Sequence, residues 1–362
     1  MYNNKIEKSI NFYLLANNLK YIPQEKDSSI ANHIYGSIIL ANAINNEYHH
    51  VENIGIVIRM ILFKTINEYY PQELKSLIKE MNTNINIYNE LYNLENPNYQ
   101  LTLKCINFEN ILENFLNKFP QENNRIYIKK IYQKAKDYGI IQFLGPDDHK
   151  NFEIFRFYYL NRFLHTKIRS DWDERHWNIS SKRIEKVAEH IIGTIALSTI
   201  LDEKFNFNIN LNKVVTMLSL HEIGEINIGD ITPFDGITKE EKEEIEHKAI
   251  IDIIGNLQNN EDMINLLYEF DERKTNEAKF AYYCDKLEAD IQSKIYQDLG
   301  YHHPLTNQEN NIVFKSNKVQ DMIKNGATTA FDIWYEWDKP IYQEEETFTK
   351  ILKYIKNTNL KK

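Results

Sequence analysis

The chain has 362 residues, 42% of them hydrophobic and 26% charged, with a net charge of −9 at neutral pH. This composition is typical of a globular protein with a full core, and the acidic balance argues against a protein that neutralises a nucleic-acid polymer. The sequence has no run of 18 apolar residues and no signal-peptide pattern, so we expect no membrane segment. Two cysteines make no disulfide framework, and a cytoplasmic location is expected.

Apolar residues recur at three-to-four spacing along most of the chain, for example in residues 10–19, 184–195 and 214–220. Proline and glycine are scarce, and no extended alternation of period two is present. This pattern predicts an all-α fold. The turn signal Gly145-Pro146-Asp147-Asp148 predicts a domain boundary, which would divide the chain into residues 1–145 and 150–362.

One segment of the chain occurs twice. Residues 30–68 align without a gap on residues 187–225, at a constant offset of 157. The alignment pairs His33 with His190, but it sets Lys64-Thr65 opposite His221-Glu222. Because lysine and threonine cannot replace an imidazole and a carboxylate as cation ligands, we interpret the chain as a tandem duplication with one intact site.

The segment just before the repeat also matches, as residues 12–22 against 158–168, but at an offset of 146. The second copy therefore carries about eleven extra residues, roughly 169–179, which include Arg175 and Trp177. This insertion is either a substrate-facing loop or an ordinary difference in loop length.

Four side chains form the strongest chemical pattern, namely His190, the adjacent His221 and Glu222, and Asp285. Two imidazoles and two carboxylates suit a divalent cation and leave coordination positions for water and a phosphate oxygen. On a continuous helix His221 and Glu222 would point roughly 100° apart, so the helix would have to pass tangentially beside the ion.

The chain here resembles the HD-domain metal-dependent phosphohydrolases, named for a His…His-Asp…Asp ligand set, and it is most similar to their 5'-deoxynucleotidase branch. The residues that carry the resemblance are Val187-Ala188-Glu189-His190, His221-Glu222-Ile223-Gly224-Glu225, Gly229-Asp230-Ile231-Thr232-Pro233, Lys239-Glu240-Glu241-Lys242, Asn276-Glu277-Ala278-Lys279-Phe280 and Asp285-Lys286-Leu287-Glu288. Their order and spacing fit across roughly residues 155–340. The fold that this implies is two tandem HD-domain-like helical bundles, which form a pseudo-dimer within one chain.

The resemblance also implies roles for individual residues. His190, His221, Glu222 and Asp285 would hold one divalent metal ion, such as Mn, Co, Mg or Zn. Glu225 would orient or deprotonate the attacking water, unless it is a plain surface carboxylate. Asp230 would contact the nucleotide or protonate its leaving oxygen, with a turn or N-cap role as the alternative. Arg175 and Trp177 would hold phosphate and sugar, although Trp177 could equally be a packing residue.

One residue departs from the family pattern, because Glu222 stands where the family has aspartate. The extra methylene would move the carboxylate outward by roughly 1.5 Å, and water activation depends on ligand geometry. Retained activity, altered metal preference and loss of activity are all open on this evidence. The degenerate residues 1–145 would act as a scaffold or as a nucleotide sensor.

Three functions remain on the sequence alone. The first is a phosphohydrolase that releases phosphate from (deoxy)nucleoside 5'-monophosphates by attack of a metal-bound water. The second is another HD hydrolase chemistry, a dNTP triphosphohydrolase or a phosphodiesterase, and the third is a nucleotide-binding pseudoenzyme. The expected partner is a small-molecule nucleotide, and the sequence leaves self-association beyond the pseudo-dimer open.

Overall fold

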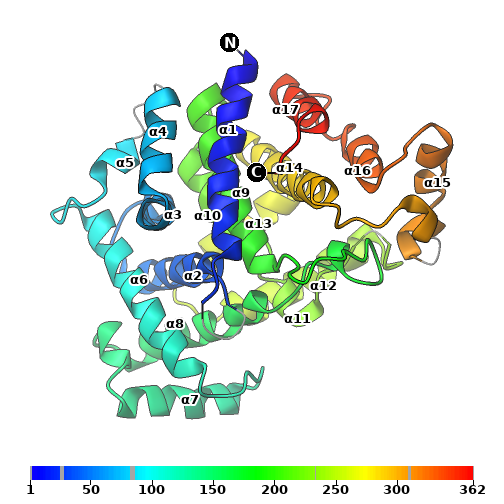
Figure 1. Ribbon diagram of the computed structural model, residues 1–362. Coiled ribbons are helices and arrows are strands. Elements are labelled where there is room, and N and C mark those ends of the chain that lie inside the picture. Colours follow the sequence, from blue (N-terminus) through cyan, green and yellow to red (C-terminus); the bar gives the residue numbers. More distant parts are fainter. Residues whose placement is uncertain (1, 25–27, 82–85, 233, 309–310, 362) are drawn as a thin grey trace.

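Helices build the whole of the described fold. The computed structural model describes residues 2–24, 28–81, 86–232, 234–308 and 311–361 (Figure 1). Across these residues the only extended pairing is two isolated bridges, Pro23 with Ser29 and Ile168 with Lys186, so the all-α prediction is confirmed. None of the described helices combines the length and the apolar character needed to cross a bilayer.

Most of the helices follow one another with short connections, and the longest connections are residues 162–186 and 299–316. The α-helices are α1 (Tyr2–Asn17), α2 (Ile30–Tyr48), α3 (Ile54–Tyr69), α4 (Pro71–Met81), α5 (Asn86–Glu90), α6 (Pro97–Leu116), α7 (Arg125–Asp137), α8 (Asp148–Asn161), α9 (Val187–Phe205), α10 (Leu211–Leu220), α11 (Glu225–Ile228), α12 (Lys239–Ile254), α13 (Asn260–Glu272), α14 (Asn276–Asp298), α15 (Asn317–Lys324), α16 (Ala330–Asp338) and α17 (Glu346–Asn357). Short 3₁₀ turns lie between them at η1 (Asn18–Tyr21), η2 (Ile141–Phe143), η3 (Arg162–His165), η4 (Ser170–Trp172), η5 (Leu305–Asn307) and η6 (Ile312–Lys315).

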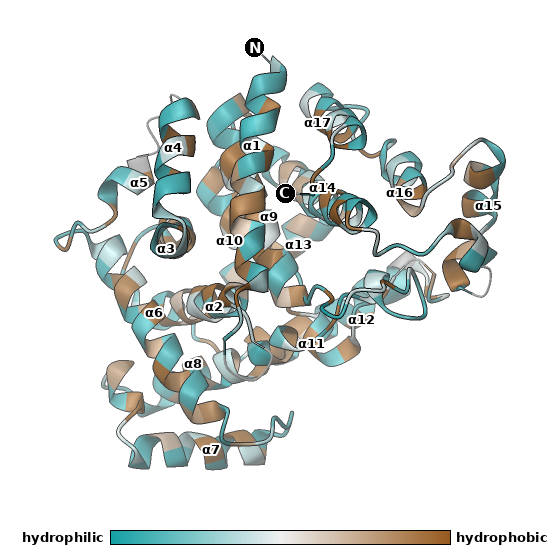
Figure 2. Ribbon diagram, in the orientation of Figure 1, coloured by the Kyte–Doolittle hydropathy of each residue, from teal (hydrophilic) through white to brown (hydrophobic). Residues whose placement is uncertain are grey.

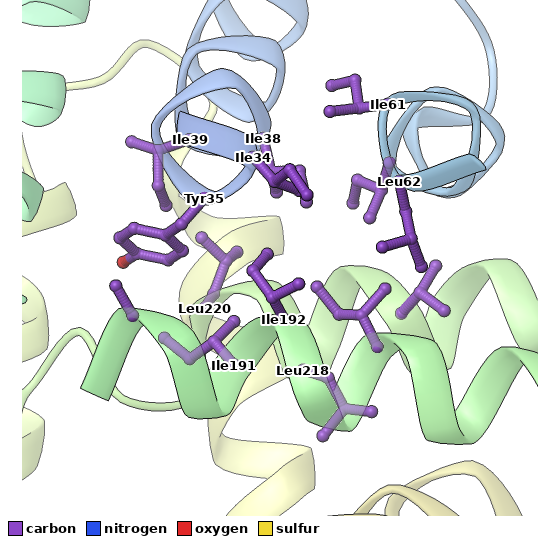
Figure 3. Packing of buried hydrophobic residues seen from close by; sticks show 14 of the residues in the cluster. Ile34, Tyr35, Ile38, Ile39, Ile61, Leu62, Ile191, Ile192, Leu218 and Leu220 are labelled. Atoms are coloured by element: carbon purple, nitrogen blue, oxygen red, sulfur yellow. The ribbon is translucent and has the colours of Figure 1, made fainter. Parts of the chain in front are cut away.

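The two copies of the repeated segment adopt matching elements. The bounds of α2 and α9 differ by 157 at both ends, and α3 and α10 also begin 157 residues apart. These four helices pack around one apolar centre (Figure 3), to which they contribute Ile34, Tyr35, Ile38 and Ile39 of α2, Ile61 and Leu62 of α3, Ile191 and Ile192 of α9, and Leu218 and Leu220 of α10. Each of these side chains is at most 1% exposed, so the centre of the fold is formed jointly by both copies.

Local sequence explains where the central helices begin and end. Ser29 caps α2 by accepting a hydrogen bond from the backbone N–H of Asn32, while Glu189 accepts one from the backbone N–H of Lys186 at the start of α9. The helix α9 ends at Asn206, which adopts a left-handed conformation. Figure 2 shows apolar residues along α2 and α9, whereas the peripheral α4 alternates between hydrophilic and hydrophobic faces.

The helix that precedes each repeated segment packs on the other copy. The helix α1 lies along α9, and α8 lies along α2. The bridges Pro23–Ser29 and Ile168–Lys186 close corresponding turns, at offsets of 145 and 157. The insertion therefore lies within the loop that the second bridge closes. Because buried side chains from Ile6 to Leu360 form one cluster, the division into residues 1–145 and 150–362 stays a prediction.

Candidate metal centre

Three separate chain segments bring the four predicted ligands together. His190 lies in the first turn of α9, His221 and Glu222 lie between α10 and α11, and Asp285 lies in α14. One donor atom from each side chain lies within 4.8 Å of every other. The side chain of Glu222 is 16% exposed, so the cluster is accessible from solvent. Residues almost a hundred positions apart in the sequence therefore meet at one point.

The distances within the cluster match those around a single ion. The Nε2 atom of His190 lies 3.0 Å from Oδ1 of Asp285 and 3.7 Å from Oε1 of Glu222. The Nε2 atom of His221 lies 3.4 Å from the same Glu222 oxygen and 3.7 Å from the same Asp285 oxygen. With bonds of about 2.0–2.2 Å, neighbouring ligands of a divalent ion lie roughly 3.0–3.6 Å apart. Two imidazoles and two carboxylates in this arrangement fit one divalent metal.

Both imidazoles are oriented by hydrogen bonds through Nδ1. The Nδ1 of His190 donates to Oε2 of Glu288 (2.6 Å), and that of His221 donates to the carbonyl oxygen of Leu218 (2.7 Å). Each ring then presents the lone pair of Nε2 to the centre. The Nε2 of His221 is buried without a hydrogen-bond partner among the described residues. An unsatisfied buried nitrogen at this point is what a metal ligand requires.

The expectation of a continuous helix through His221 and Glu222 was wrong. The helix α10 ends at Leu220, and residues 221–224 form a hydrogen-bonded turn before α11 starts at Glu225. In this turn the glutamate carboxylate reaches the same point as the Asp285 carboxylate. The break between the two helices therefore accommodates the longer side chain at position 222.

A buried ionic network supports His190 from beneath. Glu288 accepts hydrogen bonds from His190, from the hydroxyl of Tyr13 (2.7 Å) and from the ammonium of Lys20 (2.9 Å). Lys20 also pairs with Glu185, and its side chain is 2% exposed. Burial raises the pKa of Glu288, but Lys20 and His190 outweigh it and lower that pKa to about 2. Tyr13 and Lys20 lie in α1 and η1, so the first segment of the chain orients a ligand in the second.

Glu225 follows the ligand pair in a buried position. Its side chain is 3% exposed, and Oε2 has no hydrogen-bond partner among the described residues. Burial, followed by the charges of Asp230 and Glu222, raises the pKa of this carboxyl well above its usual range. The plain surface role that the sequence allowed for Glu225 is thus excluded. A buried carboxyl with a raised pKa is suited to accept a proton near neutral pH.

Asp230 ties the inserted loop to the segment that follows α11. Its Oδ2 accepts a hydrogen bond from the backbone N–H of Ser170 (2.7 Å), and its carbonyl oxygen accepts one from the Ser170 hydroxyl (2.7 Å). A second tie joins Nε2 of His176 and Oγ1 of Thr232 at 2.9 Å. Asp230 therefore has the structural role in a turn that the sequence allowed, and its catalytic role stays a prediction. Pro233 lies outside the described residues.

The two predicted substrate contacts lie in different surroundings. Trp177 is 3% exposed and contributes to the wall of a cavity beside the ligand cluster. The side chain of Arg175 is 56% exposed and pairs with Asp173 and, at 3.7 Å, with Asp235. Arg175 does not contribute to the cavity wall, so the geometry gives it no contact with the site.

Two other cations reach the ligand cluster. Arg169 is 6% exposed, and its Nη1 lies 3.3 Å from Oε1 of Glu222. The ammonium of Lys286 lies 3.1 Å from Oδ2 of Asp285. Sequence reasoning missed both residues, although Lys286 follows a predicted ligand directly and Arg169 begins the inserted segment. Their position next to ligand carboxylates could have been anticipated only for Lys286.

The cavity next to the cluster has a volume of about 200 Å³. Four charged residues line it, namely Arg169, Lys286, Asp171 and Asp338. Five aromatic side chains also line it: Trp177, Phe234, Tyr282, Trp334 and Trp337. A concave site with few charged groups and many aromatic rings is typical of small-molecule binding.

The first copy keeps the first histidine and its supporting glutamate but lacks the central ligand pair. His33 pairs with Glu109 through Nδ1, as His190 pairs with Glu288. In both copies the backbone of the histidine-bearing helix approaches this glutamate so closely that only glycine fits. A Cβ at Gly36 would overlap Glu109, and a Cβ at Gly193 would overlap Glu288. Lys64 is 8% exposed and pairs with Glu68. An ammonium group thus lies within the first copy at the sequence position that His221 holds in the second.

Comparison with known proteins agrees with this geometry. The HD domain family matches residues 164–325. These residues are the part of the chain that is similar to the HD-domain family. All four candidate ligands and Glu225 lie within the HD domain, whereas Trp334 and Trp337 follow it.

Proteins similar to this segment are named as 5'-deoxynucleotidases. A 5'-deoxynucleotidase HDDC2 from Dictyostelium discoideum is 34% identical over 120 residues, covering 31% of this chain and 63% of that protein. The human 5'-deoxynucleotidase HDDC2 is 30% identical over 124 residues (33% and 58%). The 5'-deoxynucleotidase hdd1 of Schizosaccharomyces pombe is 29% identical over 119 residues (31% and 59%). The chain thus spans about three fifths of the length of these relatives.

Proposed function

We propose that this HD domain is a metal-dependent nucleotide phosphohydrolase that releases phosphate from (deoxy)nucleoside 5'-monophosphates. The observation that carries the proposal is the convergence of four ligand atoms beside a cavity that holds two further cations. The names of the similar proteins support the nucleotide as substrate. His190, His221, Glu222 and Asp285 would hold one divalent ion.

A bound divalent ion would supply Lewis-acid activation of water and of a phosphoryl oxygen. Arg169 and Lys286 place positive charge at the same end of the cavity, where charge develops on the transferring phosphoryl group. Arg169 can hold two phosphate oxygens at once, because its guanidinium is planar. These two residues take the phosphate-binding role that the sequence analysis gave to Arg175.

Glu225 is the general base in this proposal. Water attacks phosphorus and the bond to the 5'-oxygen breaks, so the products are inorganic phosphate and a nucleoside. The proton from water passes to Glu225, and the departing 5'-oxygen takes up a proton. Asp230 remains a candidate for that second transfer once its hydrogen bond with Ser170 opens.

We further propose that residues 1–145 form a non-catalytic partner to the HD domain in an intrachain pseudo-dimer. The matching bounds of α2 and α9 support this proposal, as does the packing of α1 on α9 and α8 on α2. The scaffold role is favoured over a nucleotide sensor, because Tyr13 and Lys20 contact Glu288 directly.

Phosphate release from a nucleotide panel tests the proposed function. Metal-stripped protein would be resupplied with Mn²⁺, Co²⁺, Mg²⁺ or Zn²⁺ and given deoxy- and ribonucleoside 5'-mono- and triphosphates. We expect release from monophosphates, reduced by at least 100-fold in Glu225→Gln, since general-base catalysis contributes about 10²–10⁴-fold. The control Glu244→Gln changes an exposed glutamate of α12 and should keep full activity.

The same panel separates the alternatives. Release of triphosphate from dNTPs would instead identify a triphosphohydrolase, and hydrolysis of a diester would identify a phosphodiesterase. Silence with every metal, from a folded protein that still binds nucleotide, would identify a pseudoenzyme. Full activity in Glu225→Gln would refute the assignment of the general base.

A further inference from the structure

The cavity beside the metal centre has a wall that lies outside the matched HD-domain segment. The match ends at residue 325, whereas Trp334, Trp337 and Asp338 in this wall belong to α16. The helix α14 contacts α9 and α10 as well as α16, which lies on its far side in Figure 1. Trp334 and Trp337 are therefore the part of the aromatic wall that lies outside the matched segment.

The two sides of α14 divide the site into a phosphate end and an aromatic end. Asp285 and Glu288 face His190 on α9, whereas Tyr282 and Lys286, four residues apart, line the cavity. Lys286 contacts Asp285, so the cavity begins directly at the ligand cluster. A molecule with its phosphate at the metal would extend from there toward α16.

The remaining wall favours a flat, uncharged occupant. Trp334 and Trp337 are only half-buried, and the Nε1 of Trp334 has no hydrogen-bond partner among the described residues. The ring of Trp337 lies 5.4 Å from that of Phe234, and the ammonium of Lys318 lies 3.7 Å from the Trp337 centroid. Aromatic rings bind nucleobases by stacking on their faces. The carboxylates of Asp171 and Asp338 in the same wall disfavour additional phosphate groups.

The size of the cavity sets a further limit. About 200 Å³ lies below the roughly 300–1,000 Å³ typical of pockets for drug-sized ligands. It admits one ring system and not a dinucleotide. From these observations we propose that the cavity wall formed by Trp337, Trp334 and Phe234 is a nucleobase subsite, which selects nucleoside monophosphates over other phosphate monoesters. The proposal rests on the proposed function for the position of the phosphate.

Replacing Trp337 by alanine tests the subsite. The two substrates would be deoxyadenosine 5'-monophosphate and deoxyribose 5-phosphate, which lacks the base. Loss of one stacking surface should raise KM for the nucleotide by roughly 10- to 100-fold, leave kcat within about twofold, and leave kcat/KM for the sugar phosphate unchanged. Trp337→Phe should retain most of the affinity, because it keeps an aromatic face.

A matched control is available on the same helix. Tyr335 also lies in α16, but its ring lies over Lys356 at 3.8 Å and does not line the cavity. Tyr335→Ala should therefore leave both substrates unaffected. An equal loss for both substrates in Trp337→Ala, or the same nucleotide defect in Tyr335→Ala, would overturn the base subsite.

Binding of deoxyadenosine without phosphate separates this proposal from the proposed function. Calorimetry should detect binding to the wild type and at least tenfold weaker binding to Trp337→Ala, whether or not the protein hydrolyses nucleotides. Such a result in an inactive protein would support the subsite and refute the phosphohydrolase. Hydrolysis of nucleotides with an unchanged KM in Trp337→Ala would refute the subsite and leave the phosphohydrolase in place.

Discussion

Lys20 is a buried cation next to the metal centre, and it joins the first segment of the chain to the second. It is 2% exposed and pairs with two buried carboxylates, those of Glu185 and Glu288. Replacing it by methionine keeps most of the side-chain volume but removes the charge. Among the described residues, both carboxylates would then stay buried with His190, Tyr13 and Trp172 as their side-chain hydrogen-bond partners.

Two routes give a similar magnitude for this change. Removing one partner of a buried ion pair typically costs about 3–5 kcal/mol. Burial raises the pKa of Glu185 despite Lys20, whereas the pKa of Glu288 falls from 4.5 to about 2 on folding, a shift worth roughly 3 kcal/mol to which Lys20, His190 and Tyr13 all contribute. This contribution is present above pH 4.5 and is lost as the pH falls through about 2. We therefore expect Lys20→Met to lower the free energy of unfolding by about 3–5 kcal/mol near neutral pH.

Urea unfolding followed by circular dichroism measures the effect. The control Lys248→Met removes an exposed lysine whose partner Glu244 is also exposed, and it should cost below about 1 kcal/mol. The double variant Lys20→Met with Glu185→Gln should recover much of the loss, because the amide still accepts a hydrogen bond from Trp172. A loss under about 1 kcal/mol for Lys20→Met, or a double variant as unstable as the single one, would refute this reasoning.

Three other outcomes are expected. Asp285→Asn should abolish the visible spectrum of bound Co²⁺ while the protein remains folded; an unchanged spectrum would show that the ligand assignment is wrong. The wild type should bind one metal per chain in equilibrium dialysis, because Lys64 pairs with Glu68 in the first copy; two metals per chain would contradict a degenerate first site. His302 is buried against Trp172 and Trp177, and burial lowers its pKa to about 3. Since the unfolded state takes up a proton below about pH 6.5 and the folded state does not, the wild type should lose about 1 kcal/mol per pH unit relative to His302→Phe between pH 6.5 and 4.5. Parallel stability curves for the two proteins would show that His302 is not held neutral.

The four candidate ligands were singled out from the sequence, and the structure brings all of them together. His190, His221, Glu222 and Asp285 each stand in a local motif, and local motifs can be recognised without knowing the fold. The role of Glu222 was uncertain from sequence, because side-chain length decides coordination only once the backbone is placed. The turn of residues 221–224 settles where its carboxylate lies.

The surroundings of the site were predicted less well. Arg175 and Arg169 both lie in the inserted loop, and nothing in their spacing says which one turns inward. Arg169 reaches Glu222 because the loop is tied down by Asp230, sixty residues further along the chain. Trp334 and Trp337 carried no signal in the sequence, since aromatic residues on a helix are usually packing residues.

The sequence by itself determined the all-α class, revealed the internal repeat and singled out the four candidate ligands that the structure brings together. Apolar periodicity and short motifs are local properties, so they can be recognised in a linear chain. Only the tertiary structure decided that α1 packs on α9 and α8 on α2, and hence that Lys20 supports His190. Periodicity shows which face of a helix is apolar, but it does not show which other helix covers that face. That choice depends on the shapes and charges of all the helices when they are packed together.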